Sequence, residues 1–300
     1  MAEIVRSWPL LLVILVAYSG AFIAVHVLMW RKRRSIAKRR SPLTADLLRP
    51  AGHTLRVQLD ELKDEMFSWM FMLVIMPLLA YSSFLTQAHL IERRSSWLGI
   101  GLFLLIGIGG FIYGTWKLWR LANRKEKLSI GLDAELAVGE ELNQLMRCGA
   151  VVFHDIPAEG FNIDHVVAAR SGIYAIETKG RAKLRSGDGR KDARVEFDGK
   201  ELKFPKWRET EPIAQAERQA KWLQRWLSSA VGESVHVNAV LVLPGWYVER
   251  KGPNRVRVLS GREVNSIARG AAVVSDEMVQ RIAHQLDQRC RTVQRALTPG

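Results

Sequence analysis

The chain has 300 residues, of which 48% are hydrophobic and 25% are charged, and 44 Lys and Arg against 30 Asp and Glu give a formal net charge of +14. This apolar content excludes a disordered chain, and 23 Gly, 10 Pro and two Cys exclude a collagen or a disulfide scaffold. Residues 1–131 carry 18 basic and 8 acidic residues, whereas residues 132–300 carry 26 and 22. Most of the excess positive charge therefore lies near hydrophobic stretches. Basic residues in such positions indicate the orientation of a membrane protein in the first place, and binding of nucleic acid only in the second.

Three uncharged stretches in the N-terminal part are each long enough to cross a hydrocarbon core of ~30 Å. We predict transmembrane helices at about 8–30, 67–87 and 97–116. A cleaved signal peptide is the alternative for the first stretch, but its apolar residues continue well beyond the possible cleavage site at 17–19. His26 is the only titratable side chain clearly inside a predicted span, which disfavours a transporter.

Charged residues that flank these stretches predict the topology. Residues 31–40 include seven Lys and Arg, and five more lie within 117–127, whereas the opposite side has only Arg6, Arg93 and Arg94. The positive-inside bias then places the N-terminus outside and everything after residue 117 in the cytoplasm. The basic run at 31–40 is interpreted as a stop-transfer signal, with binding of nucleic acid or anionic lipid as the alternative.

In residues 132–300 the spacing of hydrophobic residues changes from the ~3.6-residue period of a helix to the two-residue period of strands, and later back to that of helices. The pattern predicts a helix over 132–146, strands at 151–156, 161–169, 173–178 and 195–204, a helix at 212–230, strands at 235–243 and 255–259, and short helices at 262–269 and 276–293. Gly149 is the predicted stop of the first helix. This order predicts one α/β domain of about 170 residues. Cys148 and Cys290 are interpreted as reduced thiols without metal-ligand spacing.

A predicted β-hairpin carries the residues with catalytic chemistry. If Arg170 and Ser171 form a two-residue loop, Asp164 lies directly across from Glu177, with Cβ atoms ~5 Å apart. A three-residue loop would turn this opposition into a diagonal. Strand side chains alternate, so Glu177 and Lys179 emerge on the same face, with Cα atoms ~6.6 Å apart.

Two carboxylates that face each other repel, and a hard divalent cation such as Mg²⁺ removes that cost. A neighbouring lysine can hold the attacking water or neutralise the charge that develops on phosphate. Asp164, Glu177 and Lys179 therefore suit metal-assisted phosphodiester hydrolysis. The alternative from the residues alone is a salt-bridge cluster on an exposed sheet face.

Over about 110 residues the sequence resembles the nuclease-related domain (NERD) family, a branch of the PD-(D/E)xK, restriction-endonuclease-like fold. The resemblance rests on residues 138–141, 163–167, 172–180, 212–216 and 240–243. It implies that Glu140, Asp164 and Glu177 are metal-proximal acids, that Lys179 is the catalytic lysine, and that Gln215 reaches the site from a helix start. The chain departs from the family pattern at Thr178, where Val is common, and at Glu211, where Asn is common.

Several of these residues also have a structural interpretation. Glu140 can belong to a solvated helix face, and Gln215 can cap its helix. His165 faces away from Asp164 and is interpreted as a packing residue. Trp222 and Trp226 lie four positions apart on the long helix, which favours a core or interface role over base stacking.

A basic segment follows the catalytic strand, where a phosphate backbone would approach the site. Contacts with nucleic acid are predicted for Arg181, Lys183, Arg185, Arg190 and Lys191. A solvated charged loop without a partner is the alternative. No pattern typical of sequence-specific recognition accompanies the segment.

We therefore expect a membrane region at 1–121 and a cytoplasmic domain at 122–300 with a restriction-endonuclease-like central mixed sheet flanked by helices. The expected function is a membrane-anchored nuclease that uses Mg²⁺, or Mn²⁺, to hydrolyse phosphodiester bonds in DNA. The alternative is a catalytically inactive, membrane-tethered module of the same fold that binds nucleic acid or protein. The short loops and the resemblance favour a multi-pass protein of a bacterial inner membrane, with the lipid bilayer and nucleic acid as partners. The oligomeric state is not predicted.

Overall fold

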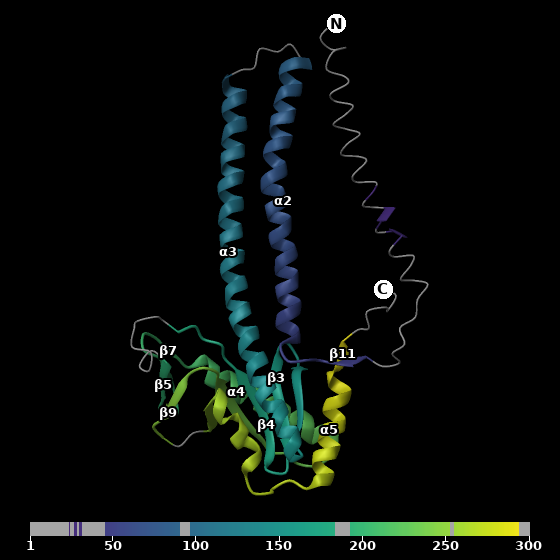
Figure 1. Cartoon of the computed structure of the whole chain (residues 1–300), viewed down its shortest axis with the longest axis vertical. Coiled ribbons are helices and arrows are strands. Elements are labelled where there is room, and N and C mark those ends of the chain that lie inside the picture. Colours follow the sequence, from purple (N-terminus) through teal and green to yellow (C-terminus); the bar gives the residue numbers. More distant parts are fainter. Residues whose placement is uncertain are drawn as a thin grey trace. The chain divides into compact units, whose positions relative to one another are not determined.

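The computed structural model describes residues 24, 27–28, 30–31, 46–90, 97–183, 193–252 and 255–293 (Figure 1). The chain folds as two compact units. The first unit consists of residues 1–44, 62–123 and 294–300, and the second consists of Ala45–Glu61 and Arg124–Val293. The predicted domain boundary at 122 lies close to the boundary at 124. Residues 45–61, which were expected in the membrane region, belong to the second unit.

Two long helices, α2 (His53–Leu90) and α3 (Trp97–Asn143), provide the described part of the first unit. Trp69 and Tyr113 contact each other edge to face, with ring centroids 5.6 Å apart. Gly114 allows close approach of the helices, because a Cβ atom there would lie 2.6 Å from a methyl carbon of Leu73. Many large apolar side chains of both helices are exposed, such as Phe67 and Leu105.

None of the helices in the described ranges combines the length and the apolar character that a bilayer crossing requires. Most of the predicted span at 8–30 lies outside the described residues. The stretches at 67–87 and 97–116 lie within α2 and α3, respectively. The membrane region of the predicted fold is thus not supported by the structure.

The second unit is built on a mixed five-stranded sheet with the order β10-β8-β4-β3-β2. Strand β3 pairs antiparallel with both of its neighbours, and β4, β8 and β10 run parallel to one another. The strands are β2 (Val151–Pro157), β3 (Asn162–Ala169), β4 (Gly172–Thr178), β8 (Val237–Leu243) and β10 (Val256–Ser260). The predicted mixed α/β sheet is confirmed.

Helices cover both faces of this sheet because its central strands are buried almost throughout, as in other sheets with parallel crossovers. One core contains α4 (Glu211–Val231) and α5 (Asp276–Cys290), with Leu223, Leu227 and Ile282 among the buried side chains. The other contains the end of α3 and the 3₁₀ helix η3 (Gly261–Arg269), represented by Leu142 and Ile267. Each buried Leu or Ile contributes about 1.5–3 kcal/mol.

A second, four-stranded sheet has the order β7-β6-β5-β9. Its strands are β5 (Arg194–Phe197), β6 (Leu202–Lys203), β7 (Arg208–Glu209) and β9 (Tyr247–Arg250). The single strand predicted at 195–204 is therefore two strands. The chain turns at Gly199, which has φ +97°, and the Asp198 carboxylate accepts the backbone N–H groups of Lys200 and Glu201.

Residues 122–129, a charged connector between the third hydrophobic stretch and the predicted helix at 132–146, are helical, so α3 continues through them without a break. The connector consists mainly of Leu, Ala, Arg, Lys and Glu, which are strong helix formers. Helix α3 is followed by a 3₁₀ turn, η1 (Gln144–Cys148), that Gly149 ends with φ +81°, as predicted.

Residues 45–61 join the second unit through a short strand and a buried polar cluster. Strand β1 (Leu47–Leu48) pairs with β11 (Arg291–Val293). Asp155, which is 3% exposed, interrupts the pairing of β2 with β3 and has a positive φ of 50°. Its carboxylate accepts hydrogen bonds from Arg49, from Asn162, and from both the backbone N–H and the hydroxyl of Thr54. This carboxylate therefore holds the start of α2 against the sheet.

Candidate nuclease site

A pocket of about 650 Å³ opens at the end of β4, within the second unit. The segments that line it are the first turn of α2, α3, the β2–β3 region, the end of β4 and the start of α4. The acids Glu135, Asp155, Asp164 and Glu177 line the pocket together with Lys179, Arg181 and Gln215. Most of the residues predicted for the site are therefore gathered in one place.

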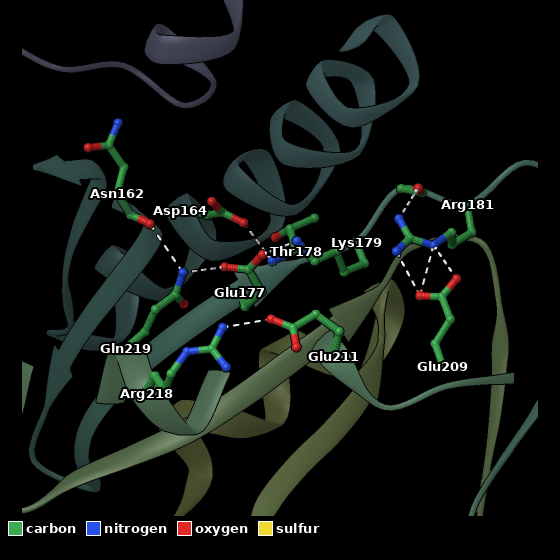
Figure 2. Close-up of polar contacts among 11 residues, drawn as sticks. Asn162, Asp164, Glu177, Thr178, Lys179, Arg181, Glu209, Glu211, Arg218 and Gln219 are labelled. Atoms are coloured by element: carbon green, nitrogen blue, oxygen red, sulfur yellow. Dashed lines mark hydrogen bonds and ion pairs between the residues drawn. The ribbon is translucent and has the colours of Figure 1, made fainter. Parts of the chain in front are cut away.

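The hairpin has the register that a two-residue loop predicts. Ala169 pairs with Gly172 and His165 pairs with Ile176, so Asp164 and Glu177 are the next residues along the two strands. The Asp164 carboxylate accepts a hydrogen bond of 2.7 Å from the backbone N–H of Thr178 (Figure 2). The period-two pattern of the two strands thus predicted the juxtaposition of the two acids correctly.

Glu177 is a buried carboxylate with both oxygens in use, since only 2% of the residue is exposed. Its Oε1 lies 2.5 Å from Nζ of Lys179, which confirms that these two side chains share a face of the sheet. Its Oε2 accepts a hydrogen bond of 2.6 Å from Nε2 of Gln219 (Figure 2). These two donors offset the cost of burying the charge.

Gln219 is a site residue that sequence reasoning missed. It lies one helical turn after Gln215 on α4, and its amide nitrogen also donates to the Asn162 carbonyl at 3.1 Å. The amide thereby connects α4 to β3 and β4. Gln215 lines the pocket as predicted, but the α4 amide that binds Glu177 is that of Gln219. The i, i+4 spacing of two glutamines on a predicted helix was the signal that could have identified it.

The acid that α3 contributes to the pocket is Glu135. It is buried, and burial, followed by the charges of Asp155 and Glu177, raises its pKa to about 8, while Lys179 opposes the shift. Burial and the charges of Glu177 and Glu135 also raise the pKa of Asp164, against the Thr178 N–H and Lys179. The raised pKa values mean that Glu135 and Asp164 hold their protons to a higher pH than ordinary carboxyl groups do.

Glu140, which the resemblance implied as the acid from this helix, is exposed and does not line the pocket. At about 100° per residue, five positions rotate a side chain roughly 140° around the helix axis, so Glu135 and Glu140 cannot face the same strand ends. Gly139, beside Glu140, instead faces the rings of His154 and His165. Cβ of Ala51 is closer still, 2.8 Å from where a Cβ atom of Gly139 would lie, so the close approach at this glycine serves packing.

Gly180 sets the distance between α3 and the lysine strand. A Cβ atom at this position would lie 2.5 Å from the carbonyl oxygen of Ile130 and 3.0 Å from Cβ of Ala134. The absence of a side chain therefore lets α3 lie directly over the end of β4, one turn before Glu135. This close approach gives a physical reason for the Gly that follows Lys179.

The basic segment is described only in part. Arg181 binds the Glu209 carboxylate through Nε and Nη2, at 2.8 and 2.7 Å, so its guanidinium is engaged within the protein (Figure 2). Lys183 is exposed. Arg185, Arg190 and Lys191 lie outside the described residues.

The donor chemistry of the pocket fits a hard divalent cation. Glu135, Asp164 and Glu177 supply carboxylate oxygens, the preferred ligands of Mg²⁺. The pKa values of Glu135 and Asp164 are raised first by burial and then by repulsion from neighbouring carboxylates, and a cation would relieve the repulsion. Gln219 also has a buried Oε1 without a partner among the described residues. No group of three His, Cys, Asp or Glu side chains in the described ranges is arranged to hold a metal ion. In this conformation Lys179 and Gln219 bind the Glu177 carboxylate, and the backbone N–H of Thr178 binds that of Asp164.

Fold and site together define a mixed α/β domain with an acidic, lysine-containing pocket at a sheet edge. Residues 130–244 match the family model described as "Nuclease-related domain" (NERD). The match includes the end of α3, the hairpin and α4, and so every acid of the pocket together with Lys179 and Gln219. It supports the NERD family and a nuclease-like function for this segment. Comparison with curated proteins returned no match, and comparison with solved structures returned none.

Proposed function

We propose that this protein is a membrane-anchored, metal-dependent nuclease that hydrolyses phosphodiester bonds in DNA. The observation that carries the proposal is the convergence of Glu135, Asp164, Glu177 and Lys179 on one pocket inside the segment that matches a nuclease-related family. An acid cluster with a neighbouring lysine is the donor set that metal-assisted phosphodiester hydrolysis requires.

The metal would be Mg²⁺ or Mn²⁺, held by carboxylate oxygens of Asp164, Glu177 and Glu135, and it would polarise the phosphate and lower the pKa of a bound water. Lys179 keeps its ammonium at the mouth of the pocket, where it neutralises charge that develops on the phosphate. Gln219 orients Glu177 by holding its Oε2 towards α4. The α4 amide is thus a positioning group.

The membrane part of the proposal rests on the three uncharged stretches and on the basic residues that flank them. With the positive-inside bias, the N-terminus lies outside and the nuclease domain lies in the cytoplasm of a bacterial cell, attached to the inner membrane. Protease protection of an N-terminal tag in spheroplasts measures this orientation. Digestion of the tag without lysis agrees with the proposal, and protection of the tag contradicts it.

Nuclease activity is tested with the full chain in a mild neutral detergent, incubated with plasmid DNA, linear DNA and single-stranded RNA in Mg²⁺, Mn²⁺ or EDTA. We expect metal-dependent cleavage of DNA that falls about 10²–10³-fold in Lys179→Ala, as for the loss of one group that stabilises a transition state. Lys221→Ala is the matched control, because this lysine of α4 is 73% exposed and has only a weak 3.8 Å pair with Glu217. Equal activity of both lysine variants contradicts the catalytic assignment.

A non-catalytic binding module is the second candidate, and one observation favours it. Both oxygens of Glu177 are already bound, by Lys179 and Gln219, as in a purely structural buried ion pair. Binding of DNA in EDTA without cleavage in either metal, in a protein that unfolds cooperatively, identifies the module.

A further inference from the structure

A second cavity, of about 590 Å³, lies in the second unit between β9, β10 and η3. Its lining is dominated by Arg250, Arg257, Arg262 and Arg269, against a single acid, Glu263. We name these four arginines the arginine cleft. No function discussed so far uses it.

Two of the four arginines are held in place by protein groups. Arg250 donates to the Val258 carbonyl at 2.7 Å and to the Glu263 carboxylate at 2.6 Å. Arg257 donates to the Ser266 hydroxyl at 2.6 Å. Each of these guanidiniums still has further N–H groups that can face a ligand, because a guanidinium carries five N–H donors.

The other two arginines, Arg262 and Arg269, are exposed and have no hydrogen bond or ion pair with any described residue. Since Glu263 offsets only one of the four charges, the cleft carries a local excess of about three positive charges. Charges of one sign brought together in a hollow repel one another, and an anion relieves this repulsion.

The chemistry of the lining indicates which anion fits. Planar guanidinium groups match the oxygens of phosphate bidentately. The lining has one apolar residue, Leu259, and no aromatic residue on which a base could stack. Several separate guanidiniums without a base pocket suit successive phosphates of a nucleic acid backbone better than a single nucleotide.

The cleft also lies on the same sheet edge as the nuclease pocket. Thr178 pairs with Val242, and Val242 pairs with Leu259, so the ends of three neighbouring strands share one row of the sheet. Leu259 packs on the η3 face of this row, whereas Glu177 contacts α4 on the other face. At ~4.8 Å per strand, the backbones of Thr178 and Leu259 are ~10 Å apart.

We propose that the arginine cleft binds the phosphodiester backbone of a nucleic acid that extends beyond the nuclease pocket. The proposal deepens the proposed function, on which it rests for the identity of the substrate. The cleft supplies sequence-independent affinity and sets the direction in which the substrate leaves the pocket.

The test measures binding separately from cleavage. A fluorescently labelled DNA duplex is titrated with the full chain in neutral detergent and EDTA, at several salt concentrations, and binding is followed by anisotropy. We expect the double variant R262Q/R269Q to bind roughly tenfold more weakly, and the slope of log K against log [salt] to fall by about 1.8, which is about 0.9 for each phosphate that is no longer neutralised. The control K221Q/R225Q removes two exposed charges from α4 and should change neither quantity.

Each outcome bears on one proposal. If R262Q/R269Q and K221Q/R225Q bind DNA alike, or if the wild type does not bind DNA in EDTA, the arginine cleft proposal is overturned, and cleavage assays in Mg²⁺ still decide the nuclease. If binding depends on the cleft but no metal supports cleavage, the cleft proposal stands and the nuclease fails. If R262Q/R269Q keeps its DNA affinity and instead loses binding to detergent micelles that contain phosphatidylglycerol, the occupant is a lipid phosphate and the proposal is overturned.

Discussion

Removal of the Asp155 carboxylate tests how residues 45–61 are held within the second unit. The carboxylate accepts from Arg49 at 3.1 Å, from the Thr54 backbone and hydroxyl at 3.1 and 2.8 Å, and from Asn162 at 3.1 Å. A hydrogen bond to a charged group contributes about 1.5–3 kcal/mol and a neutral one about 1 kcal/mol. Because the four donors share one carboxylate and can turn to water when it is removed, we expect Asp155→Ala to lower the free energy of unfolding by about 3–4 kcal/mol.

The backbone at this position makes a second substitution informative. Asp155 has φ 50°, a conformation that costs a residue with a Cβ atom about 1 kcal/mol and costs Gly almost nothing. Asp155→Gly loses the same hydrogen bonds but should be about 1 kcal/mol more stable than Asp155→Ala. Loss of the Asp155 charge should also lower the pKa of Glu135, because this charge is the second cause of its raised value.

Urea unfolding of the full chain in detergent, followed by tryptophan fluorescence, measures these differences, and hydrogen exchange locates them. Amides of residues 45–61 should lose protection in Asp155→Ala before those of the central sheet do. Glu233→Ala is the control, because Glu233 is half-exposed and its pair with Arg281 should contribute less than about 1 kcal/mol. If Asp155→Ala is no less stable than this control, or the 45–61 amides keep their protection, the carboxylate does not anchor this segment.

Three further predictions concern groups in and behind the pocket. Gln219→Leu leaves one oxygen of the buried Glu177 without a donor. We expect the free energy of unfolding in urea to fall by about 2 kcal/mol and the cleavage rate to fall as well. An unchanged rate would show that Glu177 needs no positioning. Burial lowers the pKa of His154 to about 4, so the unfolded chain takes up more protons below pH 6.5 and stability is lost as pH falls from 6.5 towards 4. Protonation of His154 should lower the free energy of unfolding by about 2 kcal/mol between pH 7 and pH 5. His154→Gln should lack this part of the pH dependence if the assignment is right. The pKa of Glu135 is raised to about 8, so the folded state loses stability relative to the unfolded state as pH rises from 4.5 to 8. In EDTA at pH 8, Glu135→Gln should therefore be more stable than the wild type by up to about 4 kcal/mol. Added Mg²⁺ should raise the melting temperature of the wild type only. Equal melting temperatures of the two proteins in EDTA, or an equal rise with Mg²⁺, would contradict the assignment.

The His154 prediction has a structural basis in a chain of neutral groups that runs from the exposed Asn143 through His154 to the buried His165. His154 Nε2 lies 3.0 Å from Oδ1 of Asn143, and its Nδ1 lies 2.9 Å from Nδ1 of His165. Because Asn143 Oδ1 only accepts, His154 donates there and must accept from His165. Nε2 of His165 is then a buried acceptor without a partner among the described residues. His165 was interpreted from the sequence as a packing residue, and its position behind the sheet agrees.

Local patterns in the sequence were sufficient to place the hairpin and its acids. Alternation of apolar residues on both sides of the turn at 170–171 determined the register of the hairpin, and with it the placement of Asp164, Glu177 and Lys179. The sequence pattern also predicted the long helix α4 and the end of a helix at Gly149. These features depend on neighbours within a few positions, where backbone geometry leaves few choices.

Contacts between side chains from distant segments of the chain were decided only by the packing of the helices and strands. A helix presents a different residue every ~100°, so no local pattern could distinguish Glu135 from Glu140 until the packing of Gly139 and Gly180 set the rotation of α3. In the same way, the rotation of α4 against the sheet decides that Gln219, and not Gln215, binds Glu177. Residues 45–61 join the nuclease domain through a carboxylate about a hundred positions away, a pairing that depends on how separately formed elements dock.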